Sequence, residues 1–140
     1  MEKLIKQLIL HEGSEKFAYE CSEGYLTIGV GRNIDPEGGI GLNHQEIYYL
    51  LRNDLERVYR ELSILSWFDD LDSVRQDALV NMCFNLGLPK LMGFSKMLAA
   101  LAEGKYALAA AEALDSKWAK QVGKRSQDIA YMFEVGEYPE

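Results

Sequence analysis

The segment from residue 24 to 31 constrains the fold of this chain more than any other. Its aliphatic residues alternate with small or polar ones and are Leu26, Ile28 and Val30. This period of two predicts a β-strand with one buried face, so Thr27 is expected to point the opposite way. Gly29 and Gly31 carry no side chain and leave room for another chain, or a sugar, to approach the backbone.

A second strand is predicted just before this one. Phe17, Tyr19 and Cys21 share a face at the same period, and residues 22–24 read Ser-Glu-Gly, which is typical of a hairpin turn. The pattern therefore predicts a β-hairpin in which Cys21 and Thr27 lie on paired strands.

Glu12 is expected at the end of a helix that precedes this hairpin. Its apolar stripe at helical spacing consists of Leu4, Ile5, Leu8 and Ile9. Glu12 extends the stripe by one turn, and a carboxyl at the end of a buried stripe is partly desolvated, which favours the protonated form and suits a general acid. A solvated glutamate at a helix end is the simpler interpretation. The spacing to Cys21 and Thr27, with eight and then five intervening residues, favours the acid.

The rest of the chain is predicted to be helical. Asn43, followed by Glu46 three residues later, is typical of a capping box at the start of a helix of nearly twenty residues. A further helix is expected to begin at Asp72 or Ser73 and to stop at residues 87–89, which read Gly-Leu-Pro. Shorter helices are expected over 95–103, 105–114 and 124–133.

Composition indicates one compact domain. The chain has 140 residues, of which 48% are hydrophobic and 26% charged, and it contains no internal repeat or low-complexity run. Its net charge of -7 argues against nucleic acid as a partner, because phosphate binding needs clustered lysine and arginine. No metal site or cofactor is expected.

The longest apolar run near the amino terminus, residues 8–10, is too short for a membrane span or a signal sequence. We therefore expect no stable membrane insertion, a cytosolic origin and reduced thiols. Cys83 is expected in a helical core, and a disulfide between Cys21 and Cys83 is not expected.

The spacing of Glu12, Cys21 and Thr27 resembles the active-site signature of phage-type lysozymes, glycoside hydrolase family 24. That signature reads Glu, eight residues, Asp or Cys, five residues, Thr, and this chain is similar to its cysteine form. Further matching positions are Tyr19, Gly24, Tyr25, Gly29, residues 71–75, 81–87, 93–94 and 116–118, Gln121 and Arg125. The resemblance covers most of the chain, although Arg32 stands where some members have a histidine.

The resemblance implies an α+β, mostly α, two-lobed lysozyme-like fold within a single domain, residues 1–140. A small β-hairpin lobe (1–42) would be joined by a long helix (43–62) to a helical lobe (63–140). The implied function is that of an endolysin that hydrolyses the β-1,4 bond between N-acetylmuramic acid and N-acetylglucosamine in peptidoglycan. A monomer is expected, starting in the host cytoplasm and reaching the wall at lysis through a separate holin.

Two other functions stay open. A catalytically impaired module of the same fold would bind peptidoglycan without turnover, and a small helical domain with a fortuitous signature would not bind the wall at all.

In the implied reaction Glu12 protonates the leaving oxygen. Thr27 holds a water through its hydroxyl, which is too weak an acid to be the base. Cys21 is compatible with three roles: general base, covalent nucleophile or water-positioning group. Glu20 and Glu23, the nearest other carboxylates, are expected to be solvated.

Residues of the second lobe are implied to complete the site. Arg125 matches an arginine that pairs with the catalytic acid, which would favour ionised Glu12 and oppose the effect of desolvation. The implied saccharide-binding positions are Asn33, Phe84, Asn85 and Gln121. Phe84 is also compatible with a core position, and Trp118 is expected in the core.

Overall fold

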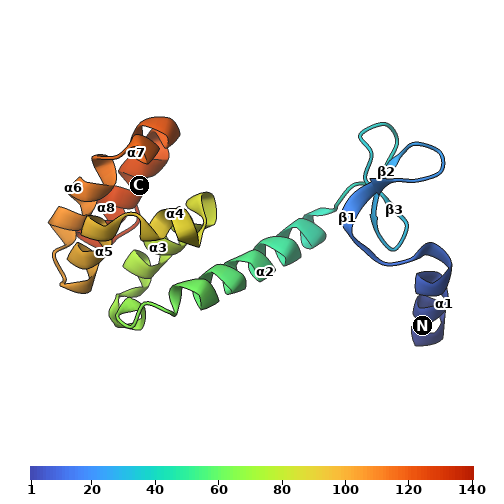
Figure 1. The fold of residues 1–140 in the computed structure, drawn as a ribbon, viewed down its shortest axis with the longest axis horizontal. Helices are drawn as coiled ribbons and strands as arrows, with labels where there is room; N and C mark the ends of the chain where they lie inside the picture. The colour runs from blue at the N-terminus through green and yellow to red at the C-terminus, as the bar shows by residue number, and fades with distance from the viewer. The chain divides into compact units, whose positions relative to one another are not determined.

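The computed structural model describes all 140 residues and confirms an α+β, mostly helical fold with one small antiparallel sheet near the amino terminus (Figure 1). The chain forms two compact units, residues 1–50 and 51–140. The first contains α1 (Glu2–Glu12), β1 (Glu15–Glu20), β2 (Leu26–Gly29), β3 (Arg32–Asn33) and the start of α2 (His44–Leu62). The second contains the rest of α2, the 3-10 helix η1 (Phe68–Asp70), α3 (Ser73–Leu86), α4 (Leu88–Met92), α5 (Ser95–Ala102), α6 (Tyr106–Leu114), α7 (Lys117–Val122) and α8 (Lys124–Val135).

The sheet of the first unit has the strand order β1-β2-β3. The predicted hairpin forms, with Tyr19 of β1 opposite Thr27 of β2. The expected place of Cys21 on the paired strand is wrong, because β1 ends at Glu20 and Cys21 begins the turn. A third strand, which the pattern did not indicate, places Asn33 opposite Thr27 on the other side. Thr27 is therefore the centre of the sheet.

The expected burial of the β2 side chains is wrong. Thr27 is only 4% exposed, whereas Leu26 and Val30 are 41% and 40% exposed. Ile28 and Val30 line an open apolar hollow together with residues at the start of α2, so the aliphatic face of β2 is not covered by the first unit.

The amino-terminal helix forms as predicted, but its apolar stripe is not buried. The exposed fractions of Leu4, Ile5, Leu8 and Ile9 lie between 41% and 54%, and α1 has no buried residue. No element of the first unit packs along this helix.

The start of α2 confirms the capping box. The Asn43 Oδ1 accepts from the Glu46 N–H at 2.8 Å, and the Glu46 Oε1 accepts from the Asn43 N–H at 2.9 Å. Glu46 also forms an ion pair with Arg32 at 2.6 Å, and Arg32 donates to the Gly41 carbonyl at 3.0 Å. These contacts tie the β2–β3 turn to the first turn of α2.

Helix limits in the second unit follow the sequence closely. Asp72 caps α3 by accepting from the Arg75 N–H, and Gly87 ends that helix. Helix α3 therefore stops where expected. Pro89 lies in the first turn of the next helix, α4, where proline is tolerated because the first helical N–H groups have no helical partner. The short helices α4 and α7 were not predicted.

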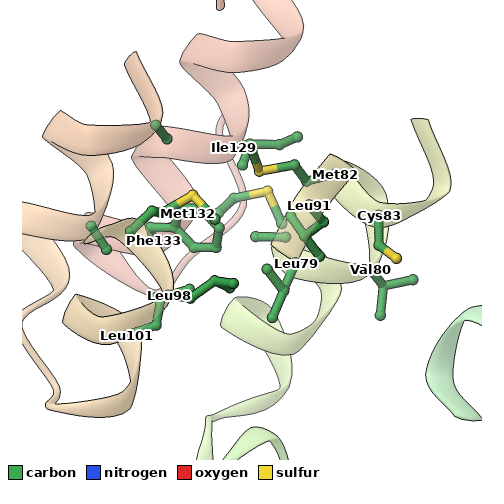
Figure 2. Packing of buried hydrophobic residues seen from close by; sticks show 14 of the residues in the cluster. Leu79, Val80, Met82, Cys83, Leu91, Leu98, Leu101, Ile129, Met132 and Phe133 are labelled. Carbon is green, nitrogen blue, oxygen red and sulfur yellow. The ribbon is translucent and has the colours of Figure 1, made fainter. Parts of the chain in front are cut away.

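The core lies in the second unit (Figure 2). Its fully buried large side chains include Leu62, Leu79, Met82, Leu91, Met97, Leu101, Ile129 and Phe133. Cys83 and Trp118 are 2% and 4% exposed, so both core predictions are confirmed. Burial raises the pKa of the Cys83 thiol to about 11, which keeps it protonated.

Candidate active site

The site begins with Cys21 and Thr27, which the hairpin brings together. The Thr27 hydroxyl donates to the Tyr25 carbonyl at 3.0 Å, and the Cys21 N–H donates to the same oxygen at 2.9 Å. The Gly24 N–H donates back to the Cys21 carbonyl at 2.9 Å, which closes the turn. Cys21 lies just past the end of β1, half-buried, with its thiol free.

The Cys21 thiol is in a setting that favours its ionised form. Hydrogen bonds from the backbone N–H groups of Tyr25 and then Glu23 lower the pKa of this thiol, and the Thr27 hydroxyl adds to the effect. Partial burial and the negative charge of Glu23 raise the pKa of the thiol, but the net shift remains downward. Donors aimed at sulfur stabilise a thiolate more than a thiol, so the β1–β2 turn increases the thiolate fraction at neutral pH.

The Thr27 hydroxyl has one proton and two acceptors within reach. While Cys21 is a thiol, this proton bonds the Tyr25 carbonyl. The Thr27 hydroxyl also contributes to lowering the pKa of the Cys21 thiol.

Glu12 ends α1, and Gly13 follows it with a φ of 79°. Its side chain is exposed, and no element of the first unit covers it. The carboxyl lies against the backbone of Gly31, where an added Cβ would come 2.8 Å from the Glu12 Oε2. The sequence suggested that the missing side chain of Gly31 leaves room for a sugar. In the structure, Glu12 occupies that room.

Three other polar residues of this unit are accounted for. Glu20 and Glu23 are exposed, as expected. Asn33 uses its side-chain oxygen within the chain, accepting from the Asp35 N–H at 2.9 Å, and its carbonyl accepts from the Ile40 and Gly41 N–H groups. Its oxygen therefore organises the loop after β3, and only its amide NH₂ is free for a sugar.

Arg125 and Phe84 lie together in the second unit. They line a hollow of about 400 Å³ with Asn81 and six other residues. Arg125 donates to the side-chain oxygen of Asn81 at 2.9 Å and to its carbonyl at 3.3 Å. The Phe84 side chain is 42% exposed. Of the two positions left open by the sequence, it therefore takes the surface position and not the core position.

Asn85 and Gln121 do not line that hollow. The Asn85 Oδ1 accepts from the buried Trp118 Nε1 at 2.8 Å, which orients the amide so that its NH₂ faces away from the indole. Gln121 is exposed on α7. Both amides thus have free donors.

Two features of the structure were missed by the sequence analysis. The first is the contact of Gly31 with Glu12, because an alternating pattern cannot show which atom fills the space beside a glycine. The second is Asp77, which accepts from the hydroxyls of Tyr59 and Tyr138.

No group of three or more histidine, cysteine or acidic residues is arranged to hold a metal ion. None of the helices combines the length and the apolar character that a membrane span requires.

The sequence of this chain is similar to those of known lysozymes. The family profile described as phage lysozyme matches residues 10–130. Two proteins of Dictyostelium discoideum, named probable T4-type lysozyme 2 and 1, are 29% and 27% identical over 164 aligned positions that cover 97% of this chain and 96% of each relative. An endolysin of Acyrthosiphon pisum secondary endosymbiont phage 1 is 29% identical over 125 positions, covering 89% of this chain and 84% of its own length.

Proposed function

The chain belongs to the phage lysozyme family and is a lysozyme-like peptidoglycan hydrolase, and we propose that it is a muramidase with Glu12, Cys21 and Thr27 as its catalytic residues. The bond cleaved is the β-1,4 bond between N-acetylmuramic acid and N-acetylglucosamine. All three lie within residues 10–130, the part of the chain that the family profile matches.

One observation carries the assignment of roles: the donors around the Cys21 sulfur. Cysteine has a reference pKa of about 8.5 and is mostly a thiol at neutral pH. The backbone N–H groups of Tyr25 and then Glu23, with the Thr27 hydroxyl, lower that pKa and so favour the negatively charged thiolate. The thiolate can then do the work of a carboxylate.

In the proposed step Glu12 gives its proton to the glycosidic oxygen while the bond to the anomeric carbon breaks. A water attacks that carbon from the opposite face and transfers a proton to the Cys21 thiolate, so one bond forms as the other breaks. The products are two shorter glycans, Glu12 carboxylate and Cys21 thiol. Proton exchange with solvent restores both groups.

Cys21 acting as base inverts the anomeric configuration, whereas Cys21 acting as nucleophile retains it through a covalent thioglycoside. We assign the base because Thr27, beside the sulfur, has oxygen lone pairs that can receive a hydrogen bond from the attacking water. Proton NMR of the first-formed reducing end on a soluble glycan distinguishes the two. A retained anomeric configuration would contradict the assignment of Cys21 as the general base. So would a mass increase on Cys21 during turnover.

The cleaved bond is tested on purified peptidoglycan. After digestion, borohydride reduction and mass spectrometry should place the new reducing ends on N-acetylmuramic acid. Glu12→Gln should yield none, and Glu2→Gln, a matched change on the same helix, should behave as wild type. Reducing ends on N-acetylglucosamine would contradict the muramidase, and binding of the wild type to the wall without any new ends would favour the impaired binding module.

Host-cell lysis is the proposed setting. It is supported by the phage relative, which is named an endolysin. The holin requirement is tested by expressing the protein in a bacterium with and without a co-expressed pore-forming holin. Lysis should need both proteins, and prompt lysis without the holin would contradict this part of the proposal.

Binding of saccharide by the second unit also belongs to the proposal. Arg125 and Phe84 share one hollow, and Asn85 and Gln121 have free amide donors. In the first unit, Asn33 can offer only its NH₂ group, since its side-chain oxygen accepts from the Asp35 N–H. Alanine at Gln121 should raise KM on a soluble glycan with little change in stability, because that side chain is exposed.

A further inference from the structure

Gly31 differs from other glycines of the first unit in what lies beside it. Its φ is 64°, and a Cβ at this position would come 2.8, 3.1 and 3.2 Å from the Oε2, Cδ and Cγ of Glu12. Gly24, Gly29 and Gly41 also have positive φ, yet a Cβ on any of them would meet nothing within 4 Å. Positive φ alone therefore does not distinguish Gly31, whereas the contact with Glu12 does.

This contact involves the outer part of the Glu12 side chain. Three of its atoms, including a carboxylate oxygen, lie against the bare Cα of Gly31. An exposed glutamate otherwise samples many rotamers, because it has three rotatable side-chain bonds. In this structure the Glu12 side chain occupies the space that a side chain at residue 31 would need.

The surface beneath Glu12 is itself held in place. Arg32 follows Gly31 and pairs with Ile28 in the sheet. The Arg32 guanidinium binds Glu46 at 2.6 Å and the Gly41 carbonyl at 3.0 Å. The turn that supports Glu12 is thus fixed on one side by the sheet and on the other by α2.

We propose that Gly31 is a positioning residue for Glu12, holding the carboxyl in the place from which it protonates the substrate. The inference rests on the proposed role of Glu12 as the acid. Proton transfer requires hydrogen-bond distance to the leaving oxygen, and a displacement of about 1 Å can cost on the order of a hundredfold in rate. A methyl group at residue 31 forces a displacement of that order, since the nearest contact would be 2.8 Å.

The first experiment measures kcat and KM on a soluble glycan for Gly31→Ala and Gly31→Asn. Asparagine tolerates positive φ better than alanine, so it adds the Cβ with less backbone strain. We expect kcat to fall by about tenfold or more in both variants with KM nearly unchanged, on the scale set by misplacement of a catalytic group. Gly41→Ala and Gly41→Asn are the matched controls, since Gly41 has a φ of 59° and open space, and they should keep wild-type kcat.

The second experiment does not depend on activity. The urea midpoint of Gly31→Ala is compared in the wild-type background and in Glu12→Ala, which lacks the contacting atoms. We expect a larger loss in the wild-type background, whereas Gly41→Ala should cost the same in both. Gly31→Asn replaces Gly31→Ala in this cycle if the alanine variant does not fold.

The outcomes separate the positioning role from the function on which it rests. Wild-type kcat in the Gly31 variants, together with an inactive Glu12→Gln, would overturn the positioning role alone. An active Glu12→Gln would overturn the acid assignment, and with it the positioning role, even if the stability coupling between Gly31 and Glu12 were measured. Equal stability losses in both backgrounds would show that the contact is not made in solution.

Discussion

Thr27 and Cys21 donate to the same acceptor, the carbonyl oxygen of Tyr25, at 3.0 and 2.9 Å. One donor is a side chain and the other a backbone N–H, so only Thr27 is free to turn toward another acceptor. The Thr27 hydroxyl also lowers the pKa of the Cys21 thiol, so its removal is expected to change the charge on Cys21.

Substitution of Cys21 tests the thiolate. Cys21→Ser should lose most activity, because a serine hydroxyl is not ionised at neutral pH. Cys21→Asp should be active and should extend the acidic limb of kcat/KM to lower pH, since the reference pKa falls from about 8.5 to about 3.9. Rates of glycan hydrolysis between about pH 5 and 9, spanning the reference thiol pKa, give the comparison. A Cys21→Ser enzyme equal to wild type throughout would remove Cys21 from the chemistry.

Removal of the Thr27 hydroxyl should act on Cys21 through its pKa. Thr27→Val deletes a donor to the thiolate, so the thiol pKa should rise and activity near neutrality should fall. The Tyr25 carbonyl keeps the Cys21 N–H, so the loss in unfolding free energy should be only about 1 kcal/mol. The pH dependence of Cys21 alkylation measures the pKa, with Thr27→Ser, which keeps the hydroxyl, as the control. An unchanged alkylation profile in Thr27→Val would contradict this effect on the pKa.

Glu12→Gln should abolish hydrolysis and leave thermal stability nearly intact. The amide retains the shape that lies against Gly31 but has no acidic proton to give the leaving group. Initial rates of reducing-end formation and thermal melts test both halves of the prediction. Activity above about a tenth of wild type would be inconsistent with general acid catalysis, which contributes at least about a hundredfold.

Asp77 should control the ionisation of two tyrosines in the second unit. The pKa of Tyr59 is raised to about 12, first by burial and then by Asp77, whereas that of Tyr138 is raised to about 12 chiefly by its hydrogen bond to Asp77. In Asp77→Asn the Tyr138 pKa should therefore fall more than the Tyr59 pKa. Carbon-13 NMR titration of labelled tyrosine resolves the two, and equal shifts would contradict this order of causes.

The same pair predicts how stability changes at alkaline pH. The folded pKa values lie above the unfolded value of about 10, so the folded state keeps protons that the unfolded state loses. The contribution is complete below about pH 10 and is lost as pH rises to about 12. Urea unfolding across this window should show the decline in wild type and a shallower one in Asp77→Asn. A parallel decline in both proteins would assign the loss to other groups.

Local spacing predicted most elements of this protein because caps, turns and helix ends depend on residues that are neighbours in the chain. Asn43 and Glu46 begin α2, Asp72 begins α3, and the turn after Cys21 closes the hairpin, all as expected. The spacing of Glu12, Cys21 and Thr27 is likewise local, so it indicated the family before any fold was known.

The burial of a side chain and its contacts depend on which segments of the chain meet in space. A pattern along the sequence does not predict which segments meet. Thr27 is buried although the alternating pattern placed it opposite the face expected to be buried, whereas Leu26 and Val30 on that face are exposed. Glu12 lies on Gly31, nineteen positions away in the sequence, and the donors that lower the Cys21 pKa come from the turn geometry rather than from residue type. Residue identity supplies the acid, the thiol and the hydroxyl, and the tertiary structure decides the charge and the position of each, because electrostatics and packing act through distance in space.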